Sequence, residues 1–129
     1  LHPYEAPTNV ARLARQVRDG YFDGLTFHRV VANFVIQGGS PGANEYVGDG
    51  PYSRDEVGNR SHLRGTVGIS TRGRDTGDSQ IFINLVDNVR LDYNYTIIGT
   101  IVSGMEVVDR VLEGSIIERV TIEPWNGPQ

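Results

Sequence analysis

The sequence predicts a mainly β domain, a barrel or sandwich whose ends are covered by two helices. Three observations favour this fold class. Short segments rich in β-branched residues recur along the chain, turn-forming residues that include 16 glycines separate them, and helical periodicity is confined to two segments. The 129 residues, 38% of them hydrophobic, are enough for one domain with one core. We therefore expect a single domain over residues 1–129.

The first helix is predicted over about residues 9–19, after residues 1–7 form the end of a strand and a turn. Thr8 is the predicted N-cap and Gly20 the stop. The apolar residues recur at the spacing of one helix face, namely Val10, Leu13, Ala14 and Val17. This helix is expected to cover one end of the core.

Residues 27–40 are predicted to form two short strands joined by a tight turn. Two apolar runs, Val30-Val31 and Phe34-Val35-Ile36, are separated by Ala32-Asn33. Arg29 and Gln37 lie among them, where neighbouring side chains should be buried. Polar groups at such positions need a partner or a ligand, so we look for function here.

The rest of the chain alternates predicted loops and strands before a second helix. The loops cover residues 40–65, 72–78 and 86–94, and the strands cover 65–70, 79–84, 96–101 and 116–122. Alternation places Gln80, Phe82 and Asn84 on one strand face. Ser103 and Glu106 form a predicted capping box for a helix that ends at Gly114.

Composition excludes several classes of function. The net charge of −4 argues against nucleic acid or an anionic membrane as a partner. Every basic residue is arginine and no cysteine is present, which excludes lysine and thiolate chemistry and leaves the compartment open. His2, His28 and His62 lack metal-ligand spacing, so no metal or cofactor is expected. The adjacent carboxylates Asp55-Glu56 are expected to be solvated rather than catalytic.

A cation, two amides and two aromatic rings remain as candidate functional groups on the predicted strands: Arg29, Gln37, Gln80, Phe34 and Phe82. None can act as a nucleophile or as a base at neutral pH. Two interpretations stay open from the residues alone. Arg29 either pairs with an acid such as Asp23 above a core containing the phenylalanines, or these groups line a groove for a peptide or small molecule.

A family signature runs through the strands predicted in residues 27–40, and it comprises Phe27-His28-Arg29-Val30-Val31, Phe34 and Gln37-Gly38-Gly39. Further family segments follow in order, among them Glu5-Ala6-Pro7-Thr8, Arg64-Gly65-Thr66-Val67-Gly68, Ser79-Gln80-Ile81-Phe82-Ile83 and Leu91-Asp92-Tyr93. On these motifs, nearly the whole chain resembles the cyclophilins, which are peptidyl-prolyl cis–trans isomerases.

This resemblance implies an eight-stranded antiparallel β-barrel capped by two helices, with a groove for proline-containing peptides or unfolded proteins. It implies that Arg29, Phe34 and Gln37 are catalytic, with Arg29 facing the groove. The substrate-binding residues that it implies are His28, Val35, Ser70, Thr71, Gln80, Phe82, Arg90, Leu91 and Tyr95. Of these, Phe82 and Leu91 join Phe34 in the proline pocket. No metal or cofactor is implied.

The chain departs from the family pattern at several positions. Arg90 stands where many members have tryptophan, so we expect weak cyclosporin binding, and Tyr95 stands where histidine is common. Arg72 and Arg74 make one predicted groove loop basic, which favours acidic residues near the substrate proline. The family's first strand and most of the second should precede Leu1, so we expect a longer natural chain. A binding module for proline-containing peptides with little turnover is the alternative function.

Overall fold

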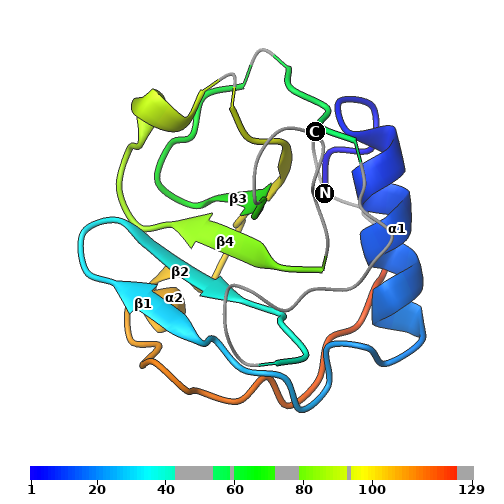
Figure 1. The fold of residues 1–129 in the computed structure, drawn as a ribbon, viewed down its shortest axis with the longest axis vertical. Coiled ribbons are helices and arrows are strands. Elements are labelled where there is room, and N and C mark those ends of the chain that lie inside the picture. The colour runs from blue at the N-terminus through cyan, green and yellow to red at the C-terminus, as the bar shows by residue number, and fades with distance from the viewer. Residues whose placement is uncertain (43–53, 59, 72–78, 93, 125–129) are drawn as a thin grey trace.

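The computed structural model describes residues 1–42, 54–58, 60–71, 79–92 and 94–124. Its centre is an antiparallel five-stranded sheet with the strand order β1-β2-β4-β3-β5 (Figure 1). The strands are β1 (Arg29–Val31), β2 (Val35–Gly38), β3 (Thr66–Ile69), β4 (Ile81–Asn84) and β5 (Ile97–Thr100). The mainly β class is confirmed, whereas the described residues form five strands and do not by themselves show the eight-stranded barrel that the resemblance implies.

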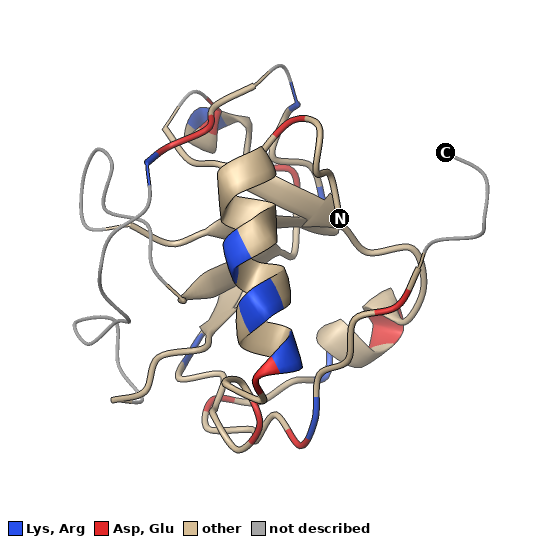
Figure 2. Ribbon diagram, turned by 90° about the vertical axis from the view of Figure 1, so that its right-hand side faces the viewer, with Lys and Arg blue, Asp and Glu red and all other residues tan. Residues whose placement is uncertain are grey.

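Helix α1 (Pro7–Arg18) packs beside the sheet, and its arginines form blue bands on its outer surface in Figure 2. Val10 and Val17 are buried, which confirms the predicted apolar face. Gly20 follows the helix in the left-handed conformation, with φ of 71°, as expected for a stop. The predicted N-cap is wrong, because the helix begins at Pro7, whose fixed φ and missing N–H suit the first turn.

Glu56 performs the capping that was predicted for Thr8. Its carboxylate accepts the backbone N–H groups of Thr8, at 3.1 Å, and Asn9, at 2.7 Å. It also accepts the Asn9 side-chain amide at 2.7 Å. These are donors that a helix leaves unsatisfied in its first turn, where negative charge is favourable. The expectation that Glu56 is merely solvated is therefore wrong.

The second helix, α2 (Met105–Val108), is shorter than predicted, and the capping box does not form. Gly104 is the N-cap, with φ of 86° and no side-chain capping bond. The helix therefore starts one residue later than a Ser103 cap requires. The turns that follow α2 end at Gly114, whose backbone is also in the left-handed conformation. Its N–H donates to Phe27 O at 2.8 Å. Arg64 fixes α2 through a two-pronged contact with Asp109 at 2.6 and 2.9 Å.

The strand predicted over residues 116–122 is reduced to a single bridge between Thr26 and Ile116. The segment crosses beside residues 24–27, and Ile117 N–H donates to Leu25 O at 2.7 Å (Figure 1). Beyond Ile117 its backbone has no strand partner within the described ranges, and Val120 N–H bonds to the Asp23 carboxylate instead. The prediction was wrong in extent, because only residues 115–117 pair with residues 24–27 and the apolar alternation that follows finds no partner in the described ranges.

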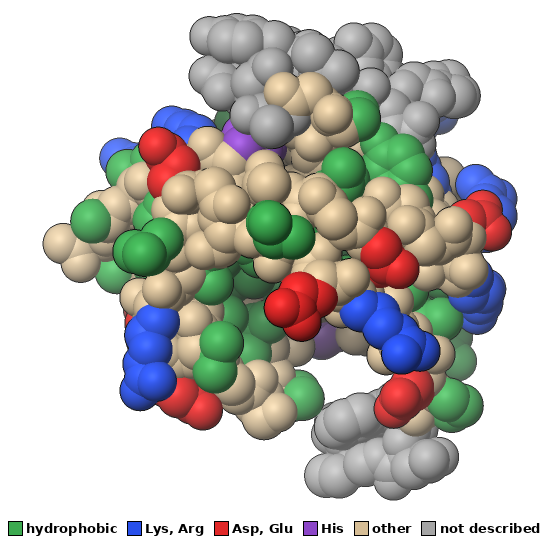
Figure 3. All heavy atoms as spheres, turned by 90° about the horizontal axis from the view of Figure 1, so that it is seen from below, with side chains coloured by type: hydrophobic (Ala, Val, Ile, Leu, Met, Phe, Trp, Pro, Cys, Tyr) green, Lys and Arg blue, Asp and Glu red, His purple; other side chains and the backbone are tan. Residues whose placement is uncertain are grey.

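The N-terminal segment contacts the outer edge of β5 but forms no strand, so of the predicted strand end and turn only the turn is found. His2 N–H donates to Ile98 O at 2.8 Å, and its ring is 2.8 Å from Thr100 Oγ1. Ala6, Val10, Ile69 and Ile98 form a buried cluster between α1 and the sheet. On the face shown in Figure 3, acidic and basic side chains alternate with exposed apolar ones.

No helix in the described ranges is long and apolar enough to cross a membrane. The same part of the chain contains no group of three or more histidine, aspartate or glutamate side chains that could hold a metal ion.

Candidate active site

One row of residues crosses four strands of the sheet and contains the main predicted site residues. Arg29 is paired with Gln37, Gln37 with Phe82, and Phe82 with Gly68. Residues directly opposite each other on antiparallel strands share a face. The strand register therefore brings together Arg29, Gln37 and Phe82, which the sequence predicted as separate elements of a site.

Gln37 links the arginine to the sheet interior. Its Oε1 accepts Arg29 Nη1 at 3.2 Å, while its Nε2 donates to Ser70 Oγ at 2.9 Å and to Gln80 Oε1 at 3.0 Å. Gln37 and Gln80 are buried, whereas the Arg29 side chain is exposed. An exposed guanidinium is thus oriented by a buried amide whose own orientation is fixed from two sides.

These contacts test the pairing of Arg29 with Asp23, which belongs to one of the two interpretations left open by the residues. Arg29 forms no ion pair with Asp23 or with another carboxylate in the described part of the chain, and its partner is the neutral Gln37. The Asp23 carboxylate accepts Val120 N–H at 3.1 Å. The structure therefore favours a guanidinium available to a ligand over one neutralised by an internal salt bridge.

Gly68 makes room for the Phe82 ring. A Cβ atom at position 68 would lie 2.4 to 3.1 Å from three atoms of that ring, closer than packed atoms tolerate. Phe82, only 5% exposed, can therefore lie across β3 next to Gln37. Its other neighbours are aromatic: the His62 ring stacks at 5.7 Å and the Tyr95 ring meets it edge-on at 5.6 Å.

A buried polar chain that the sequence analysis missed supports this aromatic cluster. Asn84 Nδ2 lies 3.2 Å from His62 Nδ1 and donates to Thr66 Oγ1 at 2.8 Å. Asn84 Oδ1 accepts the Asn88 amide at 2.9 Å, and that amide also donates to Phe34 O at 3.1 Å. The alternation that placed Asn84 beside Phe82 was the available signal, whereas His62 and Asn88 come from predicted loops without periodicity.

Burial lowers the pKa of His62 below its usual range, although the Tyr95 carbonyl at 3.3 Å and the nearby Asp92 act in the opposite direction. The Asp92 carboxylate accepts His62 N–H and the Ser61 hydroxyl, each at 2.8 Å. The hydrogen bond from the backbone N–H of His62 is the main cause of a lowered pKa at Asp92. His62 is therefore a neutral ring held in place at both ends.

Phe34 lies in the turn just before β2, directly after Asn33, which has a φ of 57°. Its side chain is half-buried, and its carbonyl accepts Leu85 N–H at 2.9 Å. The Arg90 guanidinium carbon lies 4.8 Å from the centre of its ring. Arg90 and Leu91 belong to a short 3-10 helix, η1 (Val89–Leu91), so two of the predicted residues, Phe34 and Arg90, are in contact.

The remaining predicted site residues flank this group. His28 is half-buried and precedes Arg29. Val35 is buried on β2 opposite Asn84. Ser70 lies just beyond β3, and its N–H donates to Gln80 O at 2.8 Å. Thr71 is half-buried after Ser70. The prediction of a basic loop at Arg72 and Arg74 lies outside the described residues.

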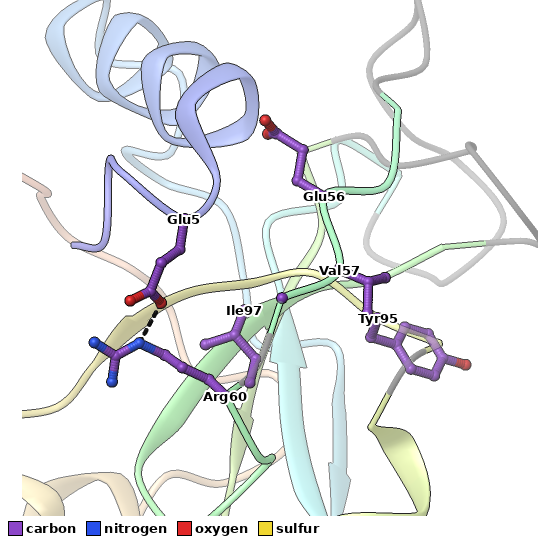
Figure 4. A pocket seen from close by; sticks show the side chains of 7 residues that line it. Glu5, Glu56, Val57, Arg60, Tyr95 and Ile97 are labelled. Carbon is purple, nitrogen blue, oxygen red and sulfur yellow. Dashed lines mark hydrogen bonds and ion pairs between the residues drawn. The ribbon is translucent and has the colours of Figure 1, made fainter.

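A separate hollow lies beside the N-terminus of α1 and does not include the arginine row. Its lining residues are Glu5, Glu56, Val57, Gly58, Arg60, Tyr95 and Ile97. Arg60 and Glu5 form an ion pair across it, and the Tyr95 ring points away from that pair (Figure 4). The Glu56 carboxylate is occupied by the N-terminus of α1, and Glu5 is occupied by Arg60.

Comparisons with known proteins identify the family of this chain. A family model described as cyclophilin type peptidyl-prolyl cis-trans isomerase/CLD matches residues 1–125. A Helicobacter pylori peptidyl-prolyl cis-trans isomerase is 40% identical over 120 residues, which span 90% of this chain and 74% of that protein. Peptidyl-prolyl cis-trans isomerase B of Bacillus subtilis is 36% identical over 125 residues, spanning 95% of this chain and 87% of that protein.

The fold is also similar to that of solved structures of cyclophilin type isomerases. The crystal structure of a Cryptosporidium parvum cyclophilin type peptidyl-prolyl cis-trans isomerase, determined in the presence of the dipeptide Ala-Pro, superposes with a TM-score of 0.89. The match covers 96% of this chain and 90% of that chain at 22% sequence identity. The family model and the curated relatives define an isomerase of the cyclophilin class. The chain belongs to the cyclophilin-type peptidyl-prolyl cis–trans isomerase family.

Proposed function

We propose that this protein catalyses rotation about X–Pro bonds in peptides and unfolded proteins, with Arg29 as the catalytic residue. The observation that carries the proposal is the exposed Arg29 guanidinium, held by Gln37 in the same cross-strand row as Phe82. Membership of an isomerase family supports the same reaction.

The chemistry suits a cation without a nucleophile or base. Rotation about a peptide bond is opposed by a barrier of about 18–20 kcal/mol, because the nitrogen lone pair is delocalised into the carbonyl. Twisting the bond localises that lone pair on the prolyl nitrogen, which becomes a hydrogen-bond acceptor. A guanidinium directed at the nitrogen therefore binds the twisted state better than either planar isomer, and such differential binding is catalysis.

Gln37 orients the Arg29 guanidinium before the substrate binds. Because its amide is fixed by Ser70 and Gln80, its oxygen can hold one edge of the Arg29 guanidinium in a set direction. A preoriented donor needs no rearrangement when the bond twists. In this proposal Gln37 positions Arg29, and the remaining guanidinium N–H groups are directed at the prolyl nitrogen.

An apolar pocket formed by Phe34, Phe82 and Leu91 grips the proline ring while the preceding residue rotates. Val35 and Tyr95 support its walls. The backbone at Ser70 and Thr71, with His28 and Gln80 nearby, binds the extended peptide. The Ala-Pro dipeptide named with the Cryptosporidium structure supports a proline-containing ligand. Because Arg90 replaces the tryptophan common in the family, cyclosporin should bind weakly.

The enzyme can be distinguished from a cyclophilin-like binding module by NMR exchange spectroscopy on an X–Pro peptide. With the protein far below the peptide concentration, we expect faster exchange between the cis and trans signals. This test needs no coupled protease. Shifted or broadened signals with an unchanged exchange rate would show the binding module and refute the proposed activity.

A further inference from the structure

Arg90 lies at a place in the site that the proposed reaction leaves unused. Its side chain is exposed, and its guanidinium carbon is 4.8 Å from the centre of the Phe34 ring. A guanidinium over an aromatic face gains cation–π attraction and still has N–H groups to offer to an anion. Arg90 therefore combines a fixed place beside Phe34 with hydrogen-bonding capacity for a ligand.

The framework beneath Arg90 sets this place. Asn88 donates to Phe34 O at 3.1 Å and to Asn84 Oδ1 at 2.9 Å, which ties the start of η1 to the turn before β2 and to β4. Leu91 N–H then bonds to Asn88 O at 2.9 Å and closes the turn that carries Arg90. Asn88 thus anchors the turn, and Arg90, two positions later, is directed over Phe34.

The charge of Arg90 is not neutralised within the described part of the chain. Arg60 pairs with Glu5 and Arg64 with Asp109, but Arg90 has no carboxylate among the residues whose positions are described. Arg29 has none there either. An exposed guanidinium that no described carboxylate neutralises favours a negatively charged ligand.

We infer that Arg90 is a specificity-determining residue that selects peptides with an acidic side chain immediately after the proline. The inference rests on the proposed function, in which Phe34 holds the proline ring. Neighbouring Cα atoms are about 3.8 Å apart, so a carboxylate next to the bound ring is within reach of a guanidinium that covers Phe34.

The position after proline is favoured over the one before it by the reaction itself. The ring and the residue that follows it stay in place while the preceding residue rotates. A contact to the following residue is therefore kept in both isomers and in the twisted state. Such uniform binding lowers KM and leaves kcat unchanged, whereas a contact to the preceding residue would favour one isomer.

The test compares two peptides that differ only in Glu or Gln after the proline, assayed by NMR exchange with the native sequence, Arg90→Gln and Arg15→Gln. Arg15→Gln is a matched control, because it removes the same charge from an exposed position on α1. We expect kcat/KM to be about two- to fivefold higher for the Glu peptide, as for a solvent-exposed ion pair. The difference should reside in KM.

This preference should disappear in Arg90→Gln, persist in Arg15→Gln and weaken at high salt. Equal kcat/KM for both peptides with the native sequence, or a preference that survives Arg90→Gln, overturns the inference. So does a preference that appears only when the acidic residue precedes the proline. Turnover of the Gln peptide tests the proposed function separately, so failure of the charge preference is distinguishable from failure of the isomerase.

Discussion

His62 shows how much of the site depends on a residue that cannot reach a substrate. Its side chain has no exposed surface, yet its ring stacks on Phe82 and its Nδ1 meets the Asn84 amide. A neutral ring can accept that amide hydrogen bond, whereas a protonated ring has no acceptor nitrogen. The packing around Phe82 thus requires His62 to stay neutral.

Stability should therefore depend on pH through His62. Burial lowers its folded pKa, so below the ordinary value of about 6.5 the unfolded chain binds a proton that the folded chain does not. We therefore expect the free energy of unfolding to fall as the pH is lowered from 7 to 5.5 because of this residue. Urea titrations of the native sequence and of His62→Gln at both pH values measure the difference.

His2→Gln is the control, because the pKa of His2 is also lowered, chiefly by burial, and its contribution must be separated. That variant should keep the part of the pH dependence that comes from His62. An identical pH dependence in the native sequence and in His62→Gln would show that His62 does not titrate in this way.

At the scale of elements, the beginning of α1 depends on a residue far from it in sequence. Glu56 lies 47 positions after Asn9 and accepts two backbone N–H groups and one side-chain amide there. Helix ends with local caps can be found from sequence, because the capping residue is adjacent. A cap delivered by a distant loop gives no such local signal, which is why Thr8 was predicted instead.

Removing this cap should destabilise the fold. We expect Glu56→Ala to lower the free energy of unfolding by about 1–2 kcal/mol, since it leaves first-turn donors unsatisfied and removes a favourable charge. Glu56→Gln should lose less, because the amide oxygen can still accept. Chemical denaturation measures both, with the exposed Glu118→Ala as the matched control. Equal stability of Glu56→Ala and Glu118→Ala would contradict the capping role.

The other elements were predictable to the extent that their signals were local. The alternation in β4 correctly placed Gln80, Phe82 and Asn84 together, because period-two patterning follows directly from strand geometry. The capping box at Ser103 failed because Gly104 adopts a left-handed conformation. Glycine permits but does not require that conformation, so the sequence could not decide between the two starts.

At the scale of the whole molecule, the candidate site depends on the register in which the strands pair. Arg29, Gln37, Phe82 and Gly68 become one row only when β1, β2, β4 and β3 pair as they do. The residue types could be named from the sequence and its family resemblance. The hydrogen bonds from Gln37 to Ser70 and Gln80 join separate strands, and therefore could not be derived from local patterns.

The most direct test of this account is the effect of Arg29→Ala on catalysis and on binding, measured separately. Exchange spectroscopy gives turnover of an X–Pro peptide, and an NMR titration gives its Kd. Because the Arg29 side chain is exposed, the variant should fold, and Arg15→Ala controls for the lost charge. We predict that kcat/KM falls by on the order of 10²-fold or more, mainly through kcat, with a nearly unchanged Kd. Near-normal turnover by Arg29→Ala would contradict the account.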